Sequence, residues 1–133
     1  MTIKAFVVED SAVIRENLIS ALEELAPVEV VGCAEDEASA MTWLNSADNV
    51  CDLVIIDIFL KQGSGLGVLR AMHDLSRQRV VLSNYLSTEM RRKCLDLGAG
   101  AMFDKSNEFD ELLTYCTRLD EGKKSQRPVR AWS

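Results

Sequence analysis

The stretch Leu53-Val54-Ile55-Ile56-Asp57 decides the fold, because four consecutive apolar residues run directly into an aspartate. A run that is apolar at every position is typical of a strand covered by helices on both faces. Such a strand belongs to a parallel sheet, and ligands bind beyond the carboxyl ends of parallel strands. The stretch therefore predicts an α/β fold and, at its end, a candidate functional residue, Asp57.

Around this strand, short runs typical of strands alternate with longer segments of helical periodicity. The predicted strands are 3–8, 28–34, 53–57, 79–82 and 101–103. The predicted helices lie between the capping residue Ser11 and Pro27, over 35–45, over 66–75, between the capping residue Ser87 and Gly98, and over 109–119. Five strand–helix units in this order predict one parallel sheet with right-handed crossovers.

Apolar residues recur at helical spacing in these segments, and we expect them to pack against the sheet. They are Ile14, Leu18, Ala21, Leu22 and Leu25 in the first helix, Met90, Cys94, Leu95 and Leu97 in the fourth, and Leu112, Leu113, Cys116 and Leu119 in the last.

Polar side chains follow four of the predicted strands. Glu9 and Asp10 follow the first strand, Asp57 ends the third, Ser83 follows the fourth, and Lys105 follows the fifth. Each residue taken alone is more often a helix cap or a surface residue. Because the carboxyl ends of parallel strands meet at one edge of the sheet, we expect these five side chains to converge.

Three carboxylates a few ångströms apart repel one another unless a cation or a proton lies between them. A hard divalent ion with oxygen ligands removes this repulsion, and Mg²⁺, for which Mn²⁺ could substitute, fits such a site. The ion would also attract a phosphoryl group, whose other oxygens the lysine and the serine would contact. The sequence thus predicts a site that accepts a phosphoryl group on a carboxylate.

From Ile3 to Leu119 the chain resembles the receiver domain of bacterial two-component response regulators, in particular a stand-alone, chemotaxis-regulator-like receiver. The matching motifs are VVED (7–10), LVIID (53–57), Gly65-Leu66, VVLS (80–83) and GAGAMFDKS (98–106). The resemblance implies a flavodoxin-like (βα)5 fold, with a five-stranded parallel sheet in the order 2-1-3-4-5 and helices on both faces.

The resemblance also implies a role for each site residue. Asp57 would accept the phosphoryl group, and Ser83 and Lys105 would contact it. The implied Mg²⁺ ligands are Glu9, Asp10, Asp57 and the backbone carbonyl of Phe59. Such a domain catalyses only its own phosphorylation and dephosphorylation, and so is not expected to be an enzyme that acts on other molecules.

The implied phosphoryl donor is a sensor histidine kinase or a phosphotransfer protein. The implied output is the binding of a downstream protein through the fourth helix, the fifth strand and the fifth helix. The expected state is a monomer or a weak dimer.

Four residues depart from the family pattern. Lys61 and Ser106 stand where proline is common, Met102 stands where an aromatic ring is usual, and Asn84 stands where small residues are commoner. Phe103 is adjacent to Met102 and should point to the other face of its strand. Met102 and Asn84 keep open the alternative of a degenerate receiver that acts as a phosphorylation-independent adaptor, although the intact acids and lysine argue against it.

Two other classes of function on a similar fold fit less well. An aspartyl phosphatase needs a D-x-D motif after the first strand, where this chain has Glu9-Asp10-Ser11. A flavin or nucleotide binder needs a phosphate loop at that place, and the glycines at 63, 65 and 67 do not form a G-x-G-x-x-G motif.

Length and charge set further limits. The 133 residues carry a net charge of −6, which opposes direct nucleic-acid binding. We expect residues 1–119 to form the receiver domain and 120–133 a short basic, solvated tail. No membrane segment or signal peptide is recognisable, so a cytoplasmic location is expected. The four scattered cysteines and the single histidine, His73, do not predict a zinc site.

Overall fold

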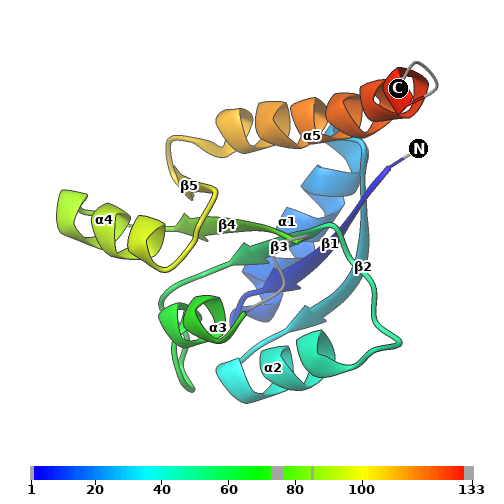
Figure 1. The fold of residues 1–133 in the computed structure, drawn as a ribbon. Coiled ribbons are helices and arrows are strands. Elements are labelled where there is room, and N and C mark those ends of the chain that lie inside the picture. Colours follow the sequence, from blue (N-terminus) through cyan, green and yellow to red (C-terminus); the bar gives the residue numbers. More distant parts are fainter. Residues whose placement is uncertain (1, 73–76, 85, 131–133) are drawn as a thin grey trace.

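The computed structural model describes residues 2–72, 77–84 and 86–130, with side chains described up to Gly122. In chain order the elements are β1 (Ile3–Val8), α1 (Ala12–Leu25), β2 (Val28–Ala34), α2 (Glu37–Asn45), β3 (Leu53–Ile56), α3 (Gly65–Ala71), β4 (Gln78–Ser83), α4 (Thr88–Asp96), β5 (Ala101–Asp104) and α5 (Phe109–Arg130). Strands and helices alternate through the whole described chain, as predicted (Figure 1).

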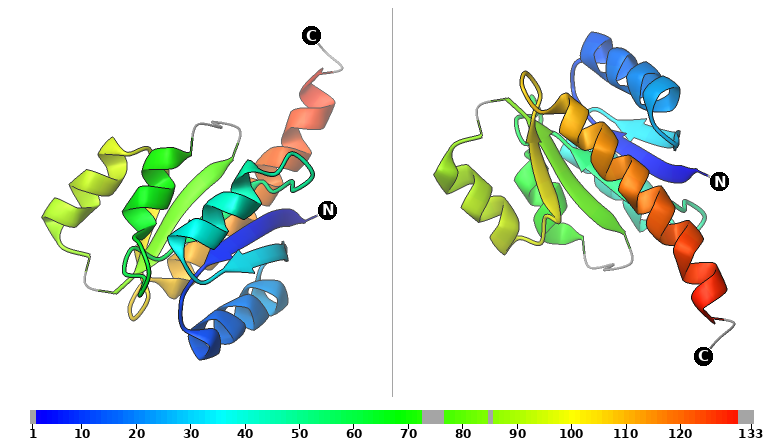
Figure 2. Two further views of the ribbon diagram at one scale, coloured as in Figure 1. Left: turned by 90° about the horizontal axis from the view of Figure 1, so that it is seen from below. Right: turned by 90° about the horizontal axis from the view of Figure 1, so that it is seen from above.

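The five strands form one sheet in the order β2-β1-β3-β4-β5, and every neighbouring pair is parallel. This order confirms the flavodoxin-like fold. Helices lie on both faces of the sheet, and Figure 2 shows the C-terminal part of α5 extending beyond it. Among the described residues, no helix is both long and apolar enough to cross a bilayer.

Two apolar layers fill the space between the sheet and its helices. Val54 and Ile56 of β3 pack in the layer that α2, α3 and α4 cover, and Leu53 and Ile55 pack in the layer that α1 and α5 cover. All four side chains are at most 1% exposed, which confirms that β3 is buried on both faces.

Hydroxyl and carboxylate side chains cap the N-termini of α1, α2 and α4. Ser11 and Ser87 accept hydrogen bonds from the backbone N–H groups of Ile14 and Met90, as predicted for the caps of α1 and α4. Asp36 caps α2, so this helix begins at Glu37, two residues later than predicted. The predicted end of the third helix, at residue 75, lies outside the described residues.

Several apolar side chains predicted to face the sheet are instead exposed. Leu95 is 55% exposed because α4 buries only Cys94, and the adjacent residue points about 100° away around the helix. Ile14 and Leu25 of α1 are also exposed, so Leu18 and Leu22 form its buried face.

The last helix is longer than predicted. α5 begins at Phe109, as predicted, but continues past Leu119 to Arg130. Asp120 is buried, so the packed face of the helix does not end at Leu119. The predicted end was therefore wrong, whereas the division of the chain into a receiver domain and a tail at residue 119 stays a prediction.

Gly65 permits a close approach between the start of α3 and the end of β3. A Cβ at this position would lie 2.0 Å from the carbonyl oxygen of Asp57 and 2.7 Å from Cα of Ile58. Because both atoms belong to the backbone, we expect Gly65→Ala to lower the free energy of unfolding by about 3 kcal/mol. Urea unfolding measures this loss. Gly122→Ala, where a Cβ would have no neighbour within 4 Å, should cost nothing.

Candidate functional site

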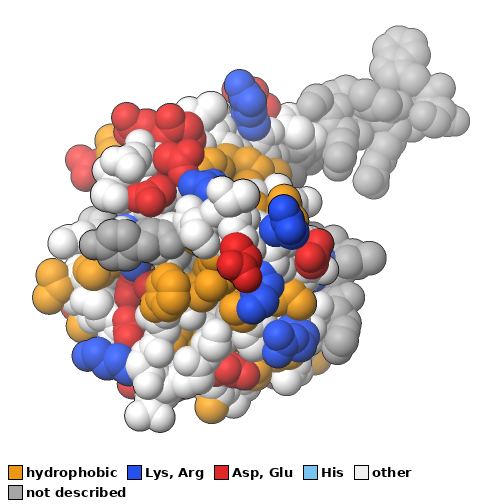
Figure 3. Space-filling model, turned by 90° about the vertical axis from the view of Figure 1, so that its left-hand side faces the viewer, with side chains coloured by type: hydrophobic (Ala, Val, Ile, Leu, Met, Phe, Trp, Pro, Cys, Tyr) orange, Lys and Arg blue, Asp and Glu red, His pale blue; other side chains and the backbone are white. Residues whose placement is uncertain are grey.

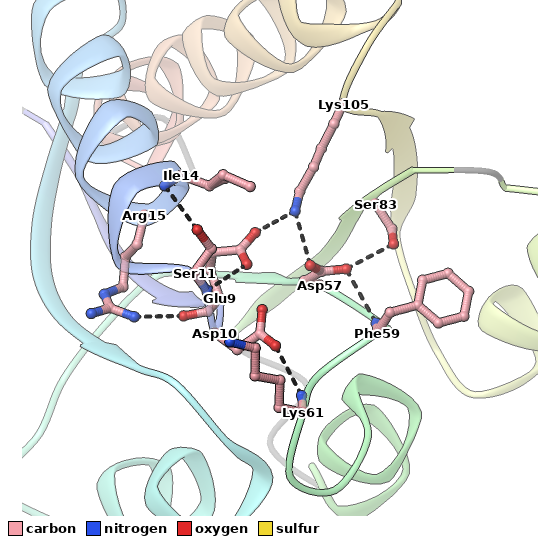
Figure 4. A network of polar contacts seen from close by, with 10 residues as sticks. All are labelled: Glu9, Asp10, Ser11, Ile14, Arg15, Asp57, Phe59, Lys61, Ser83 and Lys105. Carbon is pink, nitrogen blue, oxygen red and sulfur yellow. Dashed lines mark hydrogen bonds and ion pairs between the residues drawn. The ribbon is translucent and has the colours of Figure 1, made fainter.

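The five candidate side chains meet at the edge of the sheet where the strands end. Glu9 and Asp10 follow β1, Asp57 follows β3, Ser83 ends β4, and Lys105 follows β5 (Figure 4). In the sheet, Val8 pairs with Ile56 and Ile56 with Val81, whereas Ser83 pairs with Asp104, so β4 and β5 extend two residues beyond the ends of β1 and β3. Figure 3 views the molecule from the side toward which β3 and β4 point, and shows acidic and basic side chains together on this face.

Asp57 is 7% exposed, and both of its carboxylate oxygens have hydrogen-bond donors. The ammonium group of Lys105 lies 2.9 Å from Oδ2. The hydroxyl of Ser83 donates to Oδ1 over 2.7 Å, and the backbone N–H of Phe59 donates to the same oxygen over 3.2 Å. These contacts fix the position of the carboxylate.

Glu9 is only 2% exposed and forms an ion pair with Lys105 through Oε1. Its Oε2 accepts the N–H of Ser11, and the Arg15 guanidinium donates to its backbone carbonyl over 2.7 Å. Burial raises the pKa of Glu9 against the opposing hydrogen bonds. Burial would lower the pKa of Lys105, but its hydrogen bonds to Asp57 and Glu9 outweigh that effect and raise it. Lys105 is therefore held as a cation between two acids.

Asp10 is more exposed than Glu9 and does not bind Lys105 among the described contacts. Its Oδ2 instead accepts the backbone N–H of Lys61 over 2.9 Å. Glu9, Asp10 and Asp57 each present a carboxylate oxygen, and these oxygens lie within 4.8 Å of one another. The three acids therefore form a group that could hold a divalent metal ion.

Two aromatic residues, Phe59 and Tyr85, follow Asp57 and Ser83 by two positions in the sequence. The ring of Phe59 is 53% exposed and points away from the Asp57 carboxylate in Figure 4. Tyr85 lies outside the described residues. Asn84 is exposed. The coordination of a metal ion by the Phe59 carbonyl stays a prediction.

Two family departures have visible consequences in β5 and the loop after it. Met102 packs with the layer under α4, whereas Phe103 faces the opposite layer, where its ring meets Tyr115 edge-on. The two side chains therefore lie on opposite faces, as predicted. Ser106 donates its N–H and its hydroxyl to Oδ1 of Asp104 over 2.8 and 2.6 Å, and proline could do neither.

Three polar contacts around the site were missed by sequence reasoning. Arg15 supports the backbone of Glu9, Glu37 accepts the N–H of Ser64, and Arg91 pairs with Glu108 over 3.0 Å. Arg15 lies four residues after the predicted cap Ser11, on the helix turn nearest the acids, and this spacing could have marked it. Nothing in the local sequence marks the other two contacts, because both join elements distant along the chain.

A sheet of this order with three acids, a hydroxyl and a lysine at its carboxyl edge defines a phosphoacceptor signalling domain. The family model for the response regulator receiver domain matches residues 5–117. The chain therefore belongs to the response regulator receiver family. The acids, the hydroxyl and the lysine are assembled, and nothing supports the degenerate adaptor as an alternative.

Curated relatives are longer proteins. The chain is 34% identical over 103 residues to protein-glutamate methylesterase/protein-glutamine glutaminase 1 of Chromobacterium violaceum, covering 77% of this chain and 28% of that protein. It is also 34% identical over 101 residues to protein-glutamate methylesterase/protein-glutamine glutaminase 5 of Myxococcus xanthus. This match covers 75% of this chain and 28% of that protein. The chain thus spans about 28% of the length of these relatives. The enzymatic activity that their names state is an activity of those longer proteins.

Solved structures show the same fold. The response regulator domain of Thermotoga maritima CheB superposes with a TM-score of 0.74 at 20% identity, covering 93% of this chain and 96% of that one. The receiver domain of the putative regulator NarL from Mycobacterium tuberculosis gives a TM-score of 0.77 at 23% identity, covering 92% and 97%.

Proposed function

We propose that Asp57 accepts a phosphoryl group in a Mg²⁺-dependent reaction and that this modification switches the binding of a protein partner. One observation carries the proposal: the Asp57 carboxylate lies among two further acids and the ammonium group of Lys105. The donor is a sensor histidine kinase or a phosphotransfer protein. We further propose that Glu9, Asp10, Asp57 and the Phe59 carbonyl hold the Mg²⁺, or Mn²⁺ in its place.

The contacts of Asp57 support a direct transfer. A carboxylate oxygen of Asp57 forms a bond to phosphorus while the bond from phosphorus to the donor breaks, and the donor keeps the electron pair and takes up a proton. Lys105 and Ser83 already touch the carboxylate, so each is placed to donate to a phosphoryl oxygen afterwards. A bound Mg²⁺ would supply positive charge opposite the phosphoryl oxygens.

We propose that the downstream partner binds α4, β5 and α5. On α4, Arg92 and Lys93 are exposed, whereas the guanidinium of Arg91 is engaged by Glu108.

We also propose a cytoplasmic receiver that is monomeric or weakly dimeric and does not itself bind nucleic acid or membrane. Such a domain would catalyse only its own phosphorylation and dephosphorylation.

Acetyl phosphate tests the proposed function without a cognate kinase. The protein is incubated with acetyl phosphate and Mg²⁺, and the incorporated phosphoryl group is counted by mass spectrometry. We expect one group per chain, stable in acid and labile in base, as an acyl phosphate should be, and none when EDTA removes the metal. Absence of any incorporation with Mg²⁺ would refute the proposal.

The two acids that follow β1 should differ in their importance for Mg²⁺ binding. We expect Asp10→Ala to weaken Mg²⁺ binding at least about tenfold and Glu9→Ala to weaken it less, because Lys105 already engages Glu9. Titration of both variants with MgCl2, followed by NMR, measures the two losses. An equal or larger loss in the Glu9 variant would contradict the ranking.

Two aromatic residues close in sequence to Asp57 and Ser83 are predicted to prolong the life of the phosphoryl group. Phe59 and Tyr85 lie two positions beyond Asp57 and Ser83 in the sequence, and neither side chain carries a carboxylate or an amide that could hold an attacking water molecule. We therefore expect slow hydrolysis, since each ~1.4 kcal/mol added to the barrier slows the step about tenfold. The decay of the phosphorylated protein, followed over time, should be faster in the double variant Phe59→Asn, Tyr85→Glu. A decay that is unchanged or slower would reject shielding by these rings.

A further inference from the structure

The loop between β3 and α3 is attached to the candidate metal site through two backbone N–H groups. Lys61 N–H donates to Oδ2 of Asp10, and Phe59 N–H donates to Oδ1 of Asp57. Both acceptors are carboxylates of the group that could hold a divalent ion. A divalent ion bound by Asp10 and Asp57 would lie against the same carboxylates that hold this loop, so the position of the loop and the position of the ligand oxygens are linked.

The other end of the same loop is attached to α2 through Glu37, which is not part of the acidic group. Oε1 of Glu37 accepts the N–H of Ser64 over 2.8 Å, and the backbone N–H of Glu37 donates to the carbonyl of Gln62 over 3.2 Å. The first residue of α2 therefore holds both the main chain before Gly63 and the main chain after it.

Two glycines make room for the Glu37 side chain. A Cβ at Gly63 would lie 2.5 Å from Cβ of Glu37, and a Cβ at Gly67 would lie 2.5 Å from its Oε2. Gly63 also has a φ of +79°, a region that favours glycine. The Glu37 side chain thus lies directly against the main chain at Gly63 in the loop and at Gly67 in the first turn of α3.

We propose that Glu37 is a positioning residue for the divalent-ion site. It holds the β3–α3 loop in place, and the N–H groups of Phe59 and Lys61 in that loop in turn keep the carboxylates of Asp57 and Asp10 aligned for the ion. Mg²⁺ requires nearly ideal octahedral geometry, so a small displacement of this loop lowers its affinity. The inference rests on the proposed function, because it assumes that these acids bind Mg²⁺.

An NMR titration with MgCl2 alone, without a phosphoryl donor, tests the role of Glu37. We expect Glu37→Ala to weaken Mg²⁺ binding about fivefold, which is ~1 kcal/mol at 1.4 kcal/mol per tenfold. Glu37→Gln keeps an oxygen acceptor for the Ser64 N–H and should restore the affinity to within about twofold of the unaltered protein. Wild-type affinity in Glu37→Ala, or no rescue by Glu37→Gln, would overturn the proposal.

Asp36→Ala is the matched control for stability. It removes the cap of the same helix, because Asp36 accepts the N–H of Ser39 over 2.7 Å, but it leaves the contacts of Glu37 with the loop. Melting temperatures are measured beside the Mg²⁺ affinities. We expect Asp36→Ala to lower the melting temperature and to keep the affinity. A loss of affinity equal to that of Glu37→Ala would assign the effect to α2 stability and overturn the proposal.

Gly67→Ala tests the same contact from α3, on the other side of the Glu37 carboxylate. The added methyl group should push the Glu37 carboxylate away and weaken Mg²⁺ binding as Glu37→Ala does. In a protein that already carries Glu37→Ala, Gly67→Ala should not lower the Mg²⁺ affinity further, because the carboxylate that the added methyl group would meet is absent. If the losses of Mg²⁺ affinity from the two substitutions add fully in the double variant, the proposal is overturned. If the unaltered protein binds no Mg²⁺, both the proposed metal site and the role of Glu37 are refuted. If the unaltered protein and Glu37→Ala bind Mg²⁺ with the same affinity, only the role of Glu37 is refuted.

Discussion

Asp57→Asn is expected to reduce phosphoryl incorporation from acetyl phosphate at least about a hundredfold, or ~2.7 kcal/mol in barrier height. The amide of asparagine has nearly the shape of the carboxylate, and its oxygen can still accept from Ser83 and Phe59. It lacks the negative charge and nucleophilic oxygen that attack phosphorus. Incorporation is measured by mass spectrometry of the intact protein.

The control for this variant is Asp96→Asn, which changes an exposed acid at the end of α4 by the same chemistry. It should incorporate one phosphoryl group at the unaltered rate. Melting curves of both variants show whether the fold is kept. Undiminished incorporation in Asp57→Asn would place the acceptor elsewhere and remove the basis of the proposed function.

The fold and the convergence of the five side chains could be predicted because each depends on local signals. An apolar run such as 53–56 and the cap Ser11 identify the elements, and parallel topology brings the strand ends to one edge. Thus residues as distant along the chain as Glu9 and Lys105 could be placed together without any contact information.

The contacts made by loops could not be predicted in this way. The N–H of Lys61 reaches Asp10, and that of Ser64 reaches Glu37, only because the β3–α3 loop takes one particular path. Almost every residue has a backbone N–H group, so the sequence does not show that those of Lys61 and Ser64 are the ones that donate to these carboxylates. The length of α5 was missed for a related reason, since its hydrophobic periodicity fades after Leu119 although the helix continues.

Lys105 lies between two acids, and its removal should affect both stability and metal binding. It contacts Glu9 and Asp57, which are 2% and 7% exposed. Without the ammonium group, two buried carboxylates face each other uncompensated. We expect Lys105→Ala to lower the free energy of unfolding by about 3 kcal/mol in EDTA. Lys4→Ala, at an exposed position on β1, is the control and should change little.

Lys105→Ala should also separate phosphorylation from switching. We expect the variant to bind Mg²⁺ more tightly, because no ammonium group competes for the acids, and still to be phosphorylated at Asp57. The phosphoryl group would then lack the lysine that links it to the end of β5, so the change at α4, β5 and α5 should be lost. Amide chemical shifts in these elements, compared before and after treatment with acetyl phosphate, measure the change. Shift changes as large as those of the unaltered protein would show that Lys105 does not transmit the signal.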